Sequence, residues 1–224
     1  MSARGDVTVD GAESGADVFV IGSGGHALVC IEVLRATGRR VAGCVEVDGR
    51  QVDVGVPVLG RVDDLGELVT RDAAVFVAVM ENRARQVLTS EVIALGARLV
   101  TAISPHAVIS ASARIGAGAL LLPGAVVAAQ ATIGDGAIVN ANAAIDHAGS
   151  IGAFAHVAPG ASLAGYVTVG DGALIGVGAS VTPGRTIGAW STVGAGSAVV
   201  RDVPPGATVA GVPAKTTYGS AAMR

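Results

Sequence analysis

The feature that most constrains this fold is an aliphatic residue at every sixth position from residue 103 to residue 199. Seventeen consecutive positions of this register hold Ile, Leu or Val, and the residue four places later is nearly always Ala, Gly or Ser. A period of six matches neither the 3.6-residue turn of an α-helix nor the alternation of a plain strand, and it is typical of a parallel β-helix built from hexapeptides. The register comprises Ile103, Ile109, Ile115, Leu121, Val127, Ile133, Val139, Ile145, Ile151, Val157, Leu163, Val169, Ile175, Val181, Ile187, Val193 and Val199.

Three hexapeptides form one triangular coil of about 18 residues, so side chains 18 positions apart should stack at about 4.8 Å, the ordinary strand spacing. The aliphatic residue points into the prism and the small residue lets the backbone turn the corner. Glycines such as those of Gly134-Asp135-Gly136 supply unusual backbone angles there. The alternative is a disordered Ala/Gly/Val segment, but disorder needs no such register.

The segment before the repeats predicts a different architecture, because short apolar strands alternate there with helical patterns. Strands are expected at 18–21, 41–47, 56–59 and 74–80, and helices at 27–37, 63–69 and 82–95. We therefore expect a small Rossmann-like, doubly wound α/β domain over residues 17–101. The β-helix should cover 102–215, with a flexible tail at 1–16 and a C-terminal tail at 216–224.

A glycine turn, Gly22-Ser23-Gly24-Gly25-His26, joins the first strand to the first helix. Backbone N–H groups of such a turn suit a phosphate at the helix N-terminus. Gly22-x-Gly24-x-x-Ala27 also satisfies a loose dinucleotide fingerprint, with Glu46 placed where an acid could bind a ribose. A nucleotide, a dinucleotide and a purely structural turn therefore remain open.

Composition narrows the class of protein. Hydrophobic residues make up 51% of the chain, but Gly, Pro or a charged residue interrupts each apolar run before the roughly 18 residues that a spanning helix needs. A net charge of −3 and 3% aromatic residues argue against nucleic-acid binding. Cys30 and Cys44 lack metal-site spacing and are expected to be buried thiols. A cytoplasmic location follows.

Three motifs in this order carry a resemblance to a known family: Ile21-Gly-Ser-Gly-Gly-His26, then hexapeptides containing Ile145-Asp-His-Ala148, then Gly211-Val-Pro-Ala-Lys215. The chain resembles the NeuD-like sugar O-/N-acetyltransferases, which have a left-handed β-helix. It is most similar to those that N-acetylate the 4-amino group of nucleotide-linked amino-dideoxy sugars. The resemblance implies a homotrimer in polysaccharide biosynthesis, with acetyl-CoA as co-substrate between adjacent β-helices and active sites shared by two subunits.

The resemblance also implies roles for individual residues. His147 falls on the catalytic histidine, with Asp146 as its nearest carboxylate in sequence, and Gly165 on the glycine whose N–H faces the thioester carbonyl. We expect acetyl-CoA to contact His156, Gly165, Val177 and Lys215, where Lys215 is either a phosphate contact or a solvated tail residue. The sugar nucleotide would contact Gly22, Ser23, Gly24, Gly25, His26, Glu46, Asn82 and Asn140. Two positions depart from the family pattern, because Ala148 replaces an acid after the histidine and Glu46-Val47 replaces a pair of acids.

The spacing of two of these residues supports the assignment independently. Gly165 lies 18 positions after His147, so it should stack one coil above the imidazole and leave a notch without a side chain. Acetyl transfer to an amine needs a base for the proton and a donor for the oxyanion, which contribute roughly 10²- to 10⁴-fold and 10²- to 10³-fold. His147 and the Gly165 N–H would fill these roles without a covalent enzyme intermediate.

Three other functions remain possible from the sequence. A zinc enzyme of the γ-carbonic anhydrase type shares the β-helix but needs three imidazoles, and His147 and His156 have no third histidine at a stacking distance, so no metal is expected. O-acetylation of sialic acid or another sugar hydroxyl is the second alternative. A non-catalytic nucleotide-binding trimer is the third.

Overall fold

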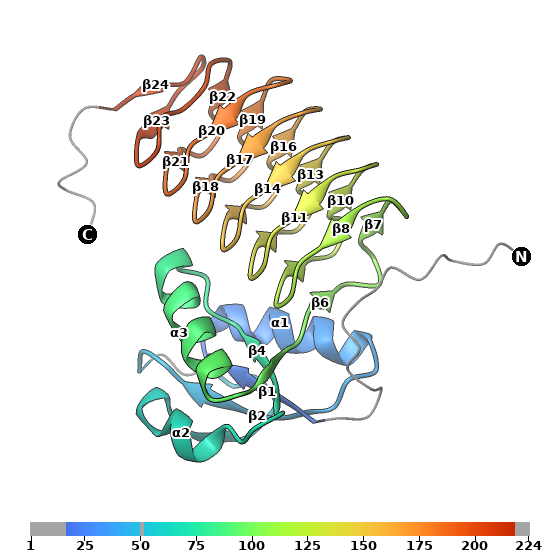
Figure 1. Ribbon diagram of the computed structural model, residues 1–224, viewed down its shortest axis with the longest axis vertical. Coiled ribbons are helices and arrows are strands. Elements are labelled where there is room, and N and C mark those ends of the chain that lie inside the picture. The colour runs from blue at the N-terminus through green and yellow to red at the C-terminus, as the bar shows by residue number, and fades with distance from the viewer. Residues whose placement is uncertain (1–16, 50–51, 218–224) are drawn as a thin grey trace, which may run out of the picture.

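A small α/β domain carries a long triangular β-helix in this computed structural model (Figure 1). The structure describes residues 17–49 and 52–217. The tails expected at 1–16 and 216–224 lie outside the described residues, apart from Thr216 and Thr217.

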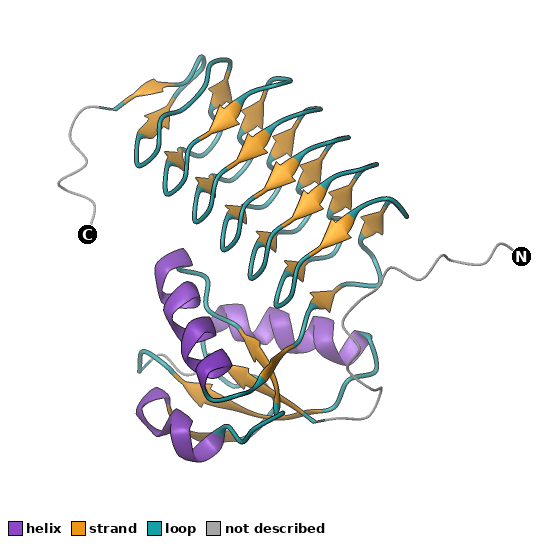
Figure 2. Cartoon of the chain, viewed as in Figure 1, coloured by secondary structure: helices purple, strands orange, loops and turns teal. Residues whose placement is uncertain are grey.

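The α/β domain contains a five-stranded parallel sheet with the order β3-β2-β1-β4-β5. Helix α1 packs on the face that meets the β-helix, and α2 and α3 pack on the other (Figure 2). This is the doubly wound arrangement that the sequence predicts. Its elements are β1 (Val18–Ile21), α1 (Gly25–Ala36), β2 (Val41–Glu46), β3 (Val58–Arg61), η1 (Val62–Asp64), α2 (Leu65–Leu68), β4 (Ala74–Val77), α3 (Asn82–Ala94) and β5 (Arg98–Leu99).

Two strands differ from the predicted ranges by more than one residue. Strand β3 begins at Val58 rather than at residue 56, because Pro57 has no N–H to donate to the ladder. Strand β4 ends at Val77, three residues early, because the carbonyls of Val79 and Met80 accept hydrogen bonds from Arg85 instead.

Three parallel sheets form the β-helix, and we call them faces 1, 2 and 3. Face 1 contains β6 (Ala102–Ile103), β9 (Leu120–Leu121), β12 (Ile138–Val139), β15 (His156–Val157), β18 (Leu174–Ile175), β21 (Thr192–Val193), β23 (Thr208–Ala210) and the antiparallel β24 (Lys215–Thr216). Face 2 contains β7 (Val108–Ile109), β10 (Val126–Val127), β13 (Ala144–Ile145), β16 (Ser162–Leu163), β19 (Ser180–Val181) and β22 (Ala198–Val199). Face 3 contains β8 (Arg114–Ile115), β11 (Thr132–Ile133), β14 (Ser150–Ile151), β17 (Thr168–Val169) and β20 (Thr186–Ile187).

The strand register confirms the predicted 18-residue coil. Ile133 pairs with Ile151 and Ile145 with Leu163, and the aliphatic residues of the register line one continuous core. At each corner the third residue after the aliphatic usually adopts a positive φ, which favours Gly or Asn. Six such corners hold a residue other than Gly: Gln130, Asn142, Ala148, Phe154, Tyr166 and Trp190.

The two domains share a hydrophobic contact on face 1. Leu120 and Ile138 point outward from β9 and β12 and are buried in the same hydrophobic cluster as Ile31 and Leu34 of α1. The α/β domain therefore covers the first coils of face 1. Strand β15 places His156 at the next position of the same outward-facing row, which continues into the candidate site.

Candidate active site

Asp146, His147 and Ala148 form the corner between β13 on face 2 and β14 on face 3. Ala148 has a φ of 53°, and its N–H donates to the carbonyl of Ala129 one coil below at 2.9 Å. This turn projects the preceding His147 side chain outward, where it is exposed. The β-helix corner thus presents an imidazole on a rigid backbone.

Gly165 stacks on His147 as the sequence predicts, but the notch that it leaves is filled by the imidazole itself. A Cβ added at Gly165 would lie 2.5 Å from both Cε1 and Nε2 of His147. The absent side chain therefore makes room for the base rather than for the thioester.

The Gly165 N–H has no hydrogen-bond acceptor among residues 17–49 and 52–217. Proline occupies the same corner position in four other turns of the register, at Pro105, Pro123, Pro159 and Pro183, so the fold requires no internal hydrogen bond there. Beside His147 this leaves a backbone donor that a substrate oxygen could use.

Asp146 holds the backbone of His147. Its Oδ1 accepts the His147 N–H at 2.6 Å. In the described part of the chain, no hydrogen bond or ion pair joins a carboxylate to the His147 ring. The contact that does reach this ring comes from Tyr166, whose ring centroid lies 5.0 Å away at an interplanar angle of 85°. Sequence reasoning missed Tyr166; an aromatic residue at a corner position that mostly holds glycine was the available signal.

His156 lies elsewhere, buried on face 1 with 5% of its surface exposed. Its Nε2 lies 3.0 Å from Asn140 Nδ2, and Asn140 Oδ1 accepts the Ala141 N–H at 2.8 Å. Since that bond fixes the amide orientation, Nδ2 is the donor and His156 Nε2 must be the acceptor. His156 is therefore neutral with its proton on Nδ1. Its Nδ1–H can donate a hydrogen bond, whereas its Nε2 already accepts one and is not free to act as a base.

Burial and a nearby cation keep two histidines neutral. Desolvation, with a smaller effect of the Arg85 charge, lowers the pKa of His26 to about 4. Desolvation first, then Arg85 and His26, lowers the pKa of His156 to about 4. At neutral pH both imidazoles can offer hydrogen bonds without carrying charge.

Arg85 of α3 is the cation in question, and it is 2% exposed. Its guanidinium donates to acceptors in both domains, and no carboxylate of the described residues forms an ion pair with it. The acceptors are the carbonyls of Val79, Met80, Gly136 and Phe154 and the side-chain oxygen of Asn82, all at 2.7 to 2.9 Å. Arg85 thus locks α3 onto the β-helix, and sequence reasoning missed it.

Asn82 takes part in the same junction. Its Oδ1 accepts from Arg85 and its Nδ2 donates to the carbonyl of Gly172 at 3.0 Å. Arg83 stacks over the Trp190 ring, with 4.2 Å between the guanidinium carbon and the ring centroid. The start of α3 is therefore fixed along one β-helix corner. The expected contact of Asn82 with substrate stays a prediction.

The glycine turn lies at the carboxyl end of β1 and opens α1. Gly22 has a φ of 128°, and a Cβ there would lie 2.6 Å from the carbonyl oxygen of Ala78 in the segment after β4. Ser23 is buried, whereas a Cβ at Gly25 would meet open space. Gly24 is the N-cap of α1 and provides no side-chain hydrogen bond, so the first N–H groups of this helix lack a side-chain cap.

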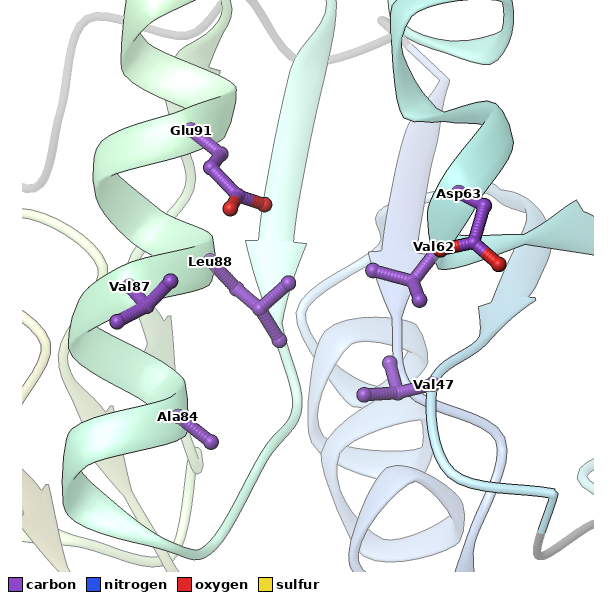
Figure 3. A pocket seen from close by; sticks show the side chains of 7 residues that line it. All are labelled: Val47, Val62, Asp63, Ala84, Val87, Leu88 and Glu91. Carbon is purple, nitrogen blue, oxygen red and sulfur yellow. The ribbon is translucent and has the colours of Figure 1, made fainter.

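A hollow lies near this edge of the sheet, between α3 and the segments that follow β2 and β3 (Figure 3). Apolar side chains form its walls, and the carboxylates of Asp63 and Glu91 stand on opposite sides. The full lining is Val47, Val62, Asp63, Ala84, Val87, Leu88 and Glu91. Glu46 lies next to it in sequence but is buried, with Oε1 accepting from the Gly49 N–H at 2.5 Å and Oε2 from Arg61 at 2.8 Å.

The candidate residues fall into two groups in one chain. Asp146, His147 and Gly165 share the corner between faces 2 and 3, whereas Asn140 and His156 lie on face 1, where the α/β domain contributes His26 of α1. Val177 is exposed at the corner between faces 1 and 2, and Lys215 is exposed in β24 at the end of the prism. Their contacts with acetyl-CoA stay predictions.

Within residues 17–49 and 52–217, no three side chains of His, Cys, Asp or Glu are grouped to hold a metal ion. None of the helices in that part of the chain is both long and apolar enough to cross a membrane.

Comparisons with known proteins fit this architecture. Residues 17–92 match the PglD N-terminal domain, and residues 112–147 match the bacterial transferase hexapeptide repeats. No curated protein sequence matches the chain significantly.

Solved structures resemble most of the chain. A histidine-to-asparagine mutant of perosamine N-acetyltransferase from Caulobacter crescentus, in complex with CoA and GDP-perosamine, is 44% identical with a TM-score of 0.87, covering 92% of this chain and 98% of its own. The acetyltransferase domain of PglB from Neisseria gonorrhoeae FA1090, in complex with acetyl coenzyme A, is 40% identical with a TM-score of 0.83, covering 90% and 98%. WeeI from Acinetobacter baumannii AYE is 26% identical with a TM-score of 0.79, covering 90% and 100%.

The left-handed β-helix with a Rossmann-like N-terminal domain defines the hexapeptide acyltransferase class. Within it, this chain belongs to the NeuD-like family of acetyl-CoA-dependent sugar N-acetyltransferases.

Proposed function

We propose that this enzyme transfers an acetyl group from acetyl-CoA directly to the 4-amino group of a nucleotide-linked amino-dideoxy sugar, with His147 as general base. The observation that carries the proposal is the pairing of an exposed imidazole with the unpartnered Gly165 N–H at one rigid corner. The relatives that bind CoA with GDP-perosamine support the choice of substrate class.

The corner can supply each proton and charge that the reaction needs. His147 takes a proton from the amine as the amine nitrogen forms its bond to the thioester carbonyl carbon. The Gly165 N–H donates to the resulting oxyanion. As the carbon–sulfur bond breaks, His147 returns the proton to the leaving thiolate, so the products are the amide and free CoA.

The glycine turn suits the diphosphate of the sugar nucleotide. Helix α1 begins there without a side-chain cap, and its first N–H groups and positive dipole end favour an anion. The burial of Glu46 favours this use over a dinucleotide, because only 4% of its surface is exposed to a ribose.

The hollow beside α3 supports guanine as the base. Its apolar walls can hold a flat ring, and its polar side chains, Asp63 and Glu91, are acceptors. Guanine presents an N–H and an amino group on one edge, and a single carboxylate accepts from both. Uracil and thymine present one N–H between two carbonyl oxygens, which a carboxylate repels.

A homotrimer would unite the two groups of site residues. Val108 and Val126 are 63% and 38% exposed on face 2, which leaves a flat apolar surface next to the His147 corner. A second copy packed there would cover these valines and bring a neighbouring α/β domain toward His147. Use of acetyl-CoA and two buried free thiols, Cys30 and Cys44, support the cytoplasm as the location.

Thermal-shift measurements with GDP-, UDP- and dTDP-linked 4-amino sugars, each with CoA, test the substrate assignment. A ligand that binds only the native state raises Tm, and more so the more tightly it binds. The GDP-linked sugar should therefore raise Tm most, because guanine fits the hollow best. The isosteric variants Asp63→Asn and Glu91→Gln should reduce that preference. A larger shift with UDP- or dTDP-sugar would contradict guanine while leaving acetyl transfer intact.

Light scattering and subunit mixing test the assembly. Inactive His147→Asn and an inactive variant of the glycine turn should regain activity when refolded together, because some shared sites would combine two intact halves. A monomer at micromolar concentration, or no recovery on mixing, would contradict shared sites.

A further inference from the structure

The imidazole of His147 is held by packing rather than by a hydrogen bond. Gly165 bounds one side of the ring, since any Cβ there would overlap it. Asp146, the adjacent carboxylate, accepts the backbone N–H of His147, and Ala148 has no polar side chain. In the described residues, the remaining contact of the ring is the edge-to-face one with Tyr166.

Tyr166 is an unexpected residue for its place in the fold. Its φ is 60°, a conformation that disfavours a bulky side chain, and its side chain is 66% exposed. Eight equivalent corner positions hold glycine with positive φ, and Gly184 is one coil above Tyr166 in the same column. Phe154 and Trp190 also hold rings at equivalent corners, where they lie over Gly136 and Gly172, whereas the Tyr166 ring contacts His147.

The backbone fixes Tyr166 relative to His147. The Tyr166 N–H donates to the His147 carbonyl at 3.0 Å, so the two residues are joined across adjacent coils. The 5.0 Å centroid separation and the 85° angle are those of a favourable aromatic pair. Gly165 bounds one side of the imidazole, and the tyrosine ring therefore limits its rotation on the other side.

We propose that Tyr166 is a positioning residue that holds the His147 imidazole in its reactive orientation through ring contact, in place of the carboxylate that Ala148 lacks. The inference rests on the proposed role of His147 as the base. Since a base displaced by about 1 Å can lose as much as 10²-fold in rate, a packing contact of this kind is enough to control turnover.

Tyr166→Asn and Tyr166→Phe separate the ring from its hydroxyl. Asn142 occupies an equivalent positive-φ corner, so asparagine at 166 should keep or raise Tm. We expect Tyr166→Asn to lower kcat about 10-fold or more with little change in either KM. Tyr166→Phe should retain kcat within about twofold, because it keeps the ring.

Gln130→Asn is the matched control, two coils below in the same column and also at positive φ. It should leave kcat and Tm unchanged. NOEs between the His147 ring and Gly165, assigned with His147→Asn, should weaken in Tyr166→Asn and stay unchanged in Gln130→Asn.

Wild-type kcat in Tyr166→Asn, or unchanged NOEs between the His147 ring and Gly165, would overturn the positioning role alone. Equal losses in Tyr166→Phe and Tyr166→Asn would overturn it too, since the hydroxyl would then be the active group. Wild-type turnover in His147→Asn would overturn the proposed function and this inference together.

Discussion

The imidazole of His147 occupies the volume that a side chain at Gly165 would need, with a Cβ at Gly165 placed 2.5 Å from Nε2. The 18-residue coil brings these two residues into register across adjacent coils. The glycine therefore has two roles at one corner, since it makes room for the base and presents a free backbone N–H beside it.

Gly165→Ala should lower kcat by about 10² while preserving the fold, because the added methyl displaces the imidazole but not the backbone. Steady-state kinetics with both substrates checks this. Gly66→Ala is the control, since a Cβ at Gly66 in α2 meets nothing within 4 Å. Wild-type kcat in Gly165→Ala would show that the ring need not lie where the structure has it.

Much of the fold could be predicted because the hexapeptide register is a local pattern. Ile133 and Ile151 each identify a coil position without reference to the rest of the chain. The stacking of Gly165 on His147 followed from the same arithmetic. Whether the imidazole or a ligand would fill the notch did not, because spacing fixes backbone register and not a side-chain rotamer.

The junction between the domains could not be predicted. The acceptors of Arg85 lie far apart in the sequence, at positions such as Val79 and Phe154. From the sequence alone, Arg85 therefore cannot be distinguished from a solvated arginine on an amphipathic helix. Likewise, the neutral state of His156 depends on how Ala141 orients the Asn140 amide. These are tertiary relationships that a single sequence does not encode in a periodic pattern.

Arg85→Met should destabilise the protein by about 3 kcal/mol or more, because it leaves one buried carbonyl and three partly buried ones without donors. Urea unfolding measures the loss of stability. In Arg85→Met we expect separate transitions for the two domains, because the variant lacks the side chain that joins them. Arg83→Met, two residues away, removes only a contact with Trp190 and should cost about 0.5 to 1 kcal/mol. Similar losses for the two variants would contradict the role of Arg85 as the lock between domains.

Stability should fall as the pH drops from about 6.5 to about 4. His26 and His156 have a pKa near 4 in the folded state, below the unfolded value of 6.5, so the unfolded state binds more protons in this window. Near pH 5 this pair of histidines should thus bind about two protons on unfolding, and the free energy of unfolding should rise with pH. Calorimetry of the wild type and of His26→Gln/His156→Gln checks this, and equal slopes in Tm against pH would contradict it.

Gly22→Ala should destabilise the α/β domain by about 2 kcal/mol or more, since the residue has a positive φ and its Cβ would overlap the Ala78 carbonyl. Gly25→Ala is the stability control, because its Cβ meets open space at the start of α1. Thermal unfolding distinguishes the two. Equal Tm values would mean that Gly22 is not required by the approach of the segment after β4.

Acetyl transfer to GDP-perosamine by wild type and His147→Asn is the most direct test of the whole account. Mass spectrometry should detect one acetyl group on the sugar and stoichiometric release of CoA. His147→Asn should lower kcat by about 10² or more with acetyl-CoA affinity largely kept. Wild-type turnover in His147→Asn, or no acetylation of any nucleotide-linked amino sugar by the wild type, would contradict the account.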